Sequence, residues 1–74
     1  MIHELEQVIL KTDIPQHSLK RGDIGTVVLV HQREKGYEVE FVTLDGETVA
    51  VISLDNSQIC PISNKEIAHV RSMN

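Results

Sequence analysis

Several residue types are scarce in this 74-residue chain, and each shortage excludes a class of protein. A single cysteine, Cys60, cannot form an internal disulfide, which excludes disulfide-stapled secreted mini-proteins and favours a cytoplasmic location. The aromatic side chains are Tyr37 and Phe41, whereas surfaces that stack single-stranded nucleic acid or bind proline-rich peptides need several rings. No apolar run approaches the about 18 residues of a membrane-spanning helix, and the N-terminus lacks a signal-peptide pattern.

Side chains that could hold a metal or carry out catalysis show no suitable spacing. The four histidines lie 14, 14 and 38 positions apart, whereas a zinc site needs four ligands held together. Glu38 and Glu40 would lie about 7 Å apart on one strand face, but acid–base chemistry on a sugar also needs a cleft. A domain of this size offers no obvious cleft. We therefore expect a non-enzymatic protein with no metal and no cofactor.

The hydrophobic pattern predicts five short β-strands. The clearest strand covers residues 37–43, where Tyr37, Val39 and Phe41 alternate with Glu38 and Glu40. Alternation of this kind indicates a strand with one buried face and one solvated face. The other predicted strands cover residues 6–12, 24–32, 47–54 and 58–60.

Turn residues predict how these strands are connected. Asp45-Gly46 favours a two-residue hairpin turn, in which both central residues have positive φ. Gly25, near the start of the 24–32 strand, predicts a bulge or a close approach of two backbones. The polar segment 12–22 predicts a long loop, anchored by the apolar side chains of Ile14 and Leu19.

A short C-terminal helix is expected over about residues 64–71. Ser63 and Glu66 fit a capping box, in which each side chain bonds the backbone of the other residue. A helix this short is unfavourable alone, so Ile67 and Val70 would have to dock on the domain. The alternatives are a frayed tail or an edge strand.

The order of these elements is typical of a small SH3-like barrel. We predict an all-β fold, with a five-stranded SH3-like barrel over residues 1–62 and a helical tail over residues 63–74. Closure of the sheet would remove the exposed strand edges that invite aggregation.

The excess negative charge lies in one third of the chain. Residues 36–57 contain five acidic side chains and no lysine or arginine, whereas the remainder has six acidic and seven basic residues. This segment is either a solvated sheet face or a surface that docks a basic protein. For docking, the candidate partner-binding residues are Glu38, Glu40, Val42, Asp45 and Glu47.

Residues 19–28, LKRGDIGTVV, resemble the GL-x-x-GD-x-GTVV signature of a family of small bacterial and cyanobacterial proteins known only as a domain of unknown function. The resemblance covers roughly residues 5–61. It implies an SH3-like barrel, related to KOW-type and nitrile-hydratase-type barrels, with no demonstrated catalysis and no cofactor. Serine stands at position 18, where the family often has glycine. Family members are often encoded beside a small toxin-like or nuclease-like protein, which implies an antitoxin or immunity role.

Three functions are compatible with these observations. The first is a protein-binding module, acting as an antitoxin for a basic, genetically linked toxin-like protein through its acidic hairpin. The second is a KOW-type nucleic-acid-binding barrel that uses Lys20, Arg21, Arg33 and Lys35, although a net charge of −4 disfavours contact with phosphates. The third is a homodimer that covers the surplus apolar surface of the strands.

Overall fold

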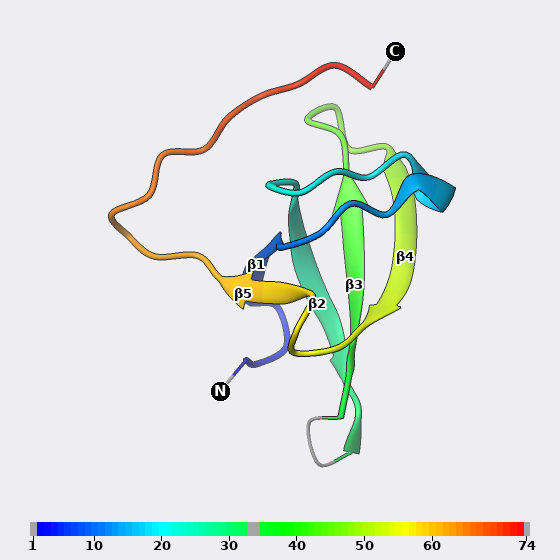
Figure 1. Ribbon diagram of the computed structural model, residues 1–74, viewed down its shortest axis with the longest axis vertical. Coiled ribbons are helices and arrows are strands. Elements are labelled where there is room, and N and C mark those ends of the chain that lie inside the picture. The colour runs from blue at the N-terminus through cyan, green and yellow to red at the C-terminus, as the bar shows by residue number, and fades with distance from the viewer. Residues whose placement is uncertain (1, 33–34, 74) are drawn as a thin grey trace.

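The computed structural model describes residues 2–32 and 35–73 and contains one antiparallel five-stranded sheet (Figure 1). The order of the strands across the sheet is β4-β3-β2-β1-β5. This arrangement confirms the all-β class and the number of strands. The strands are β1 (Gln7–Leu10), β2 (Ile24–Val30), β3 (Tyr37–Val42), β4 (Thr48–Leu54) and β5 (Ile59–Pro61).

The sheet is coiled but open. β1 pairs with both β2 and β5, and Figure 1 shows β5 running across the long axis of β3 and β4. β4 and β5 are the two edges of the sheet, and within the described residues no pairing joins them. The predicted closure into a barrel is therefore not confirmed.

The core lies inside the coiled sheet. Tyr37, Val39 and Phe41 are buried on β3, as the alternation predicts, and Glu38 and Glu40 lie on its other face. Burying a side chain of this size contributes about 1.5–3 kcal/mol, so these residues hold β3 in one register. The full core consists of Ile2, Val8, Leu10, Leu19, Val27, Tyr37, Val39, Phe41, Leu54 and Ile59.

Side chains of β3 pack closely against the β2 backbone at Gly25. A Cβ atom added there would lie 2.6 Å from Cγ1 of Val39 and 2.8 Å from Cε1 of Phe41. Both distances are shorter than a carbon–carbon contact allows. Two side chains, rather than a second backbone, therefore fill the space beside Gly25, and the bulge of β2 lies further along, between Val27 and Leu29.

The loop between β1 and β2 is anchored as predicted. Ile14 and Leu19 exchange two backbone hydrogen bonds of 2.9 and 3.1 Å, and Leu19 is buried. Between them lies a short 3₁₀ turn, η1 (Pro15–His17), followed by Ser18 in the left-handed conformation with a φ of 58°.

No helix in residues 2–32 or 35–73 is long and apolar enough to cross a membrane.

The β3–β4 hairpin forms, but its two-residue turn was wrongly predicted. Gly46 has a φ of 90°, whereas Asp45 does not have positive φ. The Thr43 amide donates to the Glu47 carbonyl (2.9 Å), and the Gly46 amide donates to the Thr43 carbonyl (2.9 Å). These bonds define a three-residue loop that ends in a left-handed glycine, a common hairpin type in which the glycine opens a bulge. A separate irregularity shifts the register of β3 against β4 between Phe41 and Val42.

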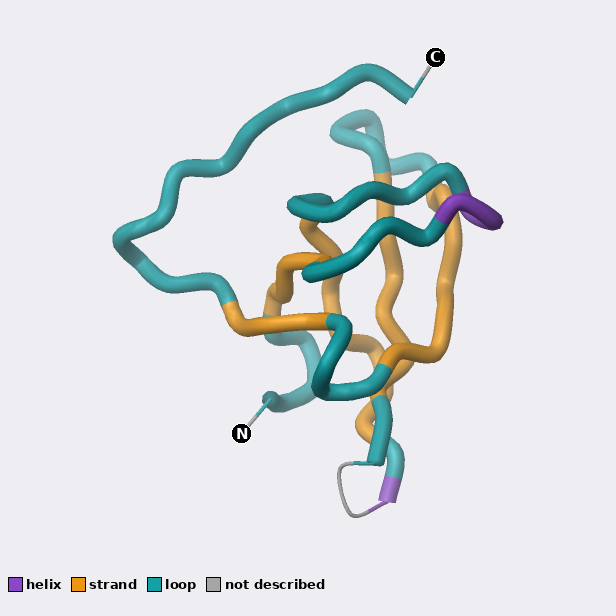
Figure 2. Tube along the Cα trace, viewed as in Figure 1, coloured by secondary structure: helices purple, strands orange, loops and turns teal. Residues whose placement is uncertain are grey.

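The predicted C-terminal helix is wrong. Figure 2 shows loop from the end of β5 to the last described residue. Half of the capping box forms, since the Ser63 amide donates to Oε1 of Glu66 at 2.6 Å, whereas the Ser63 hydroxyl accepts from the Lys65 amide at 3.2 Å. The turn is not extended into a helix, because Ile67 and Val70 remain 87% and 83% exposed. No burial of apolar surface offsets the cost of nucleating so short a helix.

Replacement of Gly25 by alanine is expected to lower the free energy of unfolding by about 1–3 kcal/mol, because Val39 and Phe41 must move to admit the methyl group. Urea unfolding followed by circular dichroism measures this change. Gln7→Ala, at an exposed position of β1, is the control, with an expected change within about 0.5 kcal/mol. Equal stability of the two variants would contradict the close packing.

Candidate functional site

The two central acidic residues of β3 lie on the outer face of the sheet, flanked by neighbouring strands. Glu38 is opposite Leu29 on β2 and Ser53 on β4. Glu40 is opposite Val51 on β4. Because residues opposite each other in adjacent strands point to the same side, these side chains share one surface. Because every second side chain of β3 points into the core, the two carboxylates between them point toward solvent, side by side.

Apolar side chains surround these carboxylates. Leu29, Val42 and Val51 are each about half exposed, at 47%, 50% and 51%. Val42 was predicted, but Leu29 and Val51 were missed. For Leu29 the reason is the bulge between Val27 and Leu29, which turns its side chain outward. We call the surface formed by Leu29, Glu38, Glu40, Val42 and Val51 the acidic face.

Both carboxylates of the acidic face accept hydrogen bonds from neighbouring side chains. Glu38 accepts one from the Ser53 hydroxyl, and its Oε2 lies 2.6 Å from Nε2 of His31. The hydrogen bond from Ser53, and then that from His31, lower the pKa of Glu38 below its ordinary value. Glu40 accepts a hydrogen bond of 3.0 Å from the Thr48 hydroxyl. Within residues 2–32 and 35–73, neither glutamate forms an ion pair with a lysine or arginine.

The remaining predicted residues, Asp45 and Glu47, lie in the turn between β3 and β4 rather than on the sheet. Asp45 accepts hydrogen bonds from the Thr43 hydroxyl and from the Glu47 amide (3.4 Å). The Thr43 hydroxyl, followed by the Glu47 amide, lowers the pKa of Asp45. Asp45 therefore stabilises the turn as well as adding negative charge at the end of the acidic face.

The basic residues of the nucleic-acid hypothesis do not form one patch. Lys20 and Arg21 precede β2 and Lys35 follows it, so the seven residues of β2 separate them by about 20 Å. Arg33 lies outside the described residues.

No group of three His, Cys, Asp or Glu side chains in the described part of the chain is arranged to hold a metal ion. Cys60 is a free, partly buried cysteine on β5.

A second surface, not predicted from the sequence, lies where the tail returns to the sheet. Arg71 donates from Nε to Oδ1 of Asp23 (2.7 Å) and from Nη2 to Oδ2 (2.5 Å), and also from Nη2 to the Ser18 carbonyl (2.9 Å). Asp23 and Arg71 lie 48 positions apart in the sequence. No local sequence pattern indicates such a contact. The sequence instead predicts a helix for this part of the tail.

The Asp23–Arg71 ion pair perturbs both groups. Partial burial acts to raise the pKa of Asp23, but hydrogen bonds from Arg71 and from the Lys20 amide, with the nearby positive charges, lower it below its ordinary value. The hydrogen bonds to Asp23 raise the pKa of Arg71. The pair is therefore fully charged at neutral pH.

Acid is expected to release the tail from the sheet. Since the pKa of Asp23 is lowered in the folded protein, the ion pair contributes stability that is complete above the ordinary aspartate pKa of about 4 and is lost as the pH falls through the lowered value. The NMR signal of the Arg71 Nε–H should keep its position from about pH 7 to about pH 5 and shift in stronger acid. Asp23→Asn is the control, in which this signal should show no acid transition. Release of the tail near neutral pH would contradict the assignment of Asp23 as the group whose protonation releases it.

Comparison with known families and proteins gives one match. The family model described as a domain of unknown function (DUF4926) matches residues 4–61, which include all five strands and the acidic face but not the tail that carries Arg71. No curated protein and no solved structure matches significantly.

Proposed function

The chain belongs to the DUF4926 family, and from its structure we propose that it is a non-catalytic docking module that binds a basic protein through the acidic face. The observation that carries this proposal is the position of Glu38 and Glu40, side by side at the centre of an exposed sheet face. Arginine and lysine side chains of the described residues do not neutralise them. Their charge is therefore available to a second molecule.

The mixture of charge and apolar surface on this face suits a protein partner. Complementary charge raises the rate of association and selects among partners, while burial of apolar side chains contributes most of the affinity. Leu29, Val42 and Val51 offer such apolar contacts beside the two glutamates. A partner that fits this face presents lysines or arginines around a small apolar centre.

Self-association through the same face is disfavoured. In a two-fold dimer the same surface of each copy meets, so the acidic faces would bring four glutamates together without compensating charge. Like charges placed opposite one another are destabilising. The homodimer is therefore a weaker candidate than a basic partner.

Nucleic acid is also a weaker candidate. Phosphate binding needs a continuous set of cations, whereas Lys20 and Lys35 lie at opposite ends of β2 and the net charge of the chain is −4.

In the specific form of this proposal, the domain is a cytoplasmic antitoxin. Its partner is then the toxin-like protein encoded beside it, and the acidic face covers the basic active site of that protein. The proposal requires no chemistry from the domain itself, because covering an active site is sufficient to inhibit it.

The double variant Glu38→Gln/Glu40→Gln tests the proposal. Co-expression with the protein encoded by the neighbouring gene should give a complex with the wild-type chain. The double variant should weaken it at least tenfold, because each lost charge contributes on the order of 1 kcal/mol or more to a complementary interface. Surface plasmon resonance at several salt concentrations measures the affinity and association rate.

Glu4→Gln/Glu66→Gln is the matched control, since it removes the same charge from positions outside the acidic segment. It should leave the affinity within about twofold of wild type. Absence of a complex with the wild-type chain, or equal weakening in both double variants, would refute docking through the acidic face.

A further inference from the structure

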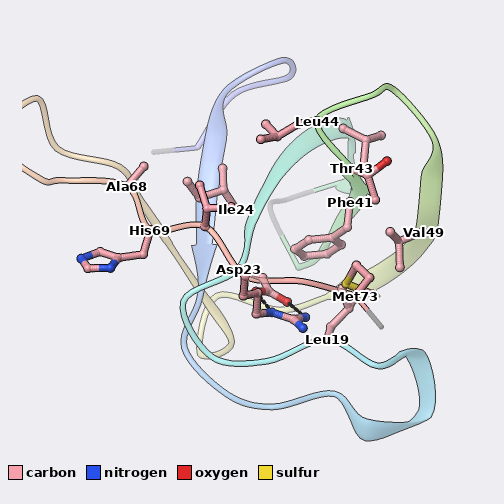
Figure 3. Close-up of a pocket in the computed structure, with 13 residues that line it drawn as sticks. Leu19, Asp23, Ile24, Phe41, Thr43, Leu44, Val49, Ala68, His69 and Met73 are labelled. Atoms are coloured by element: carbon pink, nitrogen blue, oxygen red, sulfur yellow. Dashed lines mark hydrogen bonds and ion pairs between the residues drawn. The ribbon is translucent and has the colours of Figure 1, made fainter.

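The C-terminal tail covers an apolar groove on the sheet. After β5 the chain runs outward and returns, so that its last described residues lie near the β3–β4 turn (Figure 1). Leu19, Phe41 and Val49 line the sheet side of the groove, and Met73 of the tail lies beside them (Figure 3). The side chains on the sheet side come from the loop before β2 and from β3 and β4, which lie within the residues that the family model matches.

The tail fills this groove poorly. A cavity of about 390 Å³ remains between the tail and the sheet. Leu44 lines the groove and is 93% exposed, and Val70, next to the anchoring arginine, also points mostly to solvent. The groove thus offers more apolar surface than this tail uses.

The side chain of Arg71 connects the tail to the groove. The guanidinium of Arg71 makes a two-pronged contact with Asp23 and a third hydrogen bond to the Ser18 carbonyl. Asp23 is held by its own turn, since Oδ2 also accepts a hydrogen bond from the Lys20 amide at 2.8 Å. The carboxylate is therefore oriented for a guanidinium before Arg71 arrives.

We propose that this groove is a binding site for an extended segment of another protein that carries an arginine flanked by apolar residues, and that the C-terminal tail is its built-in competitor. The arginine binds Asp23 and the Ser18 carbonyl, and the apolar neighbours occupy the space beside Phe41 and Val49. The family match ends at residue 61, so the sheet side of the groove lies within the matched residues and the tail lies outside them. The groove shares Val42 with the acidic face, but this inference rests on Asp23, Phe41 and Val49, which lie outside that face.

The tail is suited to being displaced. The residues between β5 and Arg71 are mostly exposed, and one partly exposed ion pair supplies little binding energy. Because the tail is tethered, its local concentration is on the order of millimolar, which is enough to occupy the groove when no ligand is present. A segment of another protein that also fills the cavity can bind the groove more tightly than the tail does.

A peptide added to the full-length Arg71→Ala variant tests the proposal. The probe is a synthetic peptide of residues 66–74, and the matched probe contains citrulline in place of the arginine, which removes the charge but keeps the shape. NMR titration should shift the amide signals of Leu19, Asp23 and Phe41 in the variant. The citrulline peptide should bind about two- to fivefold more weakly, as expected for the loss of one partly exposed ion pair, and wild-type protein should need more peptide than the variant because its own tail competes.

Arg71 is on the tail outside the sheet, so a spectrum with unchanged dispersion verifies the fold of the variant. Absence of shifts in the Arg71→Ala chain, or equal binding of the two peptides, would overturn the proposal. Sedimentation of the wild-type chain gives an independent result. A dimer that disappears in Arg71→Ala would mean that the tail of a second copy fills the groove, and would also overturn it.

Discussion

The close contact between β2 and β3 at Gly25 is the constraint on which the rest of this small structure depends. Without a side chain at this position, Val39 and Phe41 occupy the space against the β2 backbone, and β1 continues the sheet on the other side of Gly25. The sheet can then coil, so that β1 and β5 cross over the core instead of extending it as a flat layer. A domain of this size has few apolar residues to bury, so tight packing of each one matters for its stability.

β3 connects the core with the proposed docking surface. Its alternation was readable from the sequence, because a strand of period two that buries Tyr37, Val39 and Phe41 must present Glu38 and Glu40 to solvent. The position of the hairpin was equally readable from Asp45-Gly46. The loop type was not, since the same two residues also suit a three-residue loop in which the glycine alone is left-handed.

Long-range contacts could not be predicted. One of the two predicted capping bonds between Ser63 and Glu66 forms, yet helix formation depends on whether Ile67 and Val70 find an apolar surface, which is a property of the whole fold. The pairing of Arg71 with Asp23 likewise has no local signal in the sequence. Asp23 lies in a turn where its carboxylate already accepts a hydrogen bond from the Lys20 amide, so the turn does not indicate a further partner. Leu29 on the acidic face was missed for a related reason, since a bulge determines which way its side chain points.

The left-handed backbone conformation of Ser18 limits which residues can replace it. Glycine, asparagine and aspartate adopt this conformation easily, whereas valine and isoleucine do not, so tolerance at this position should follow backbone preference rather than polarity. The carbonyl of the same residue receives the Arg71 guanidinium. A substitution that reshapes the loop therefore also moves an acceptor for the tail, which couples the evolution of a surface loop to that of a terminus more than fifty residues away.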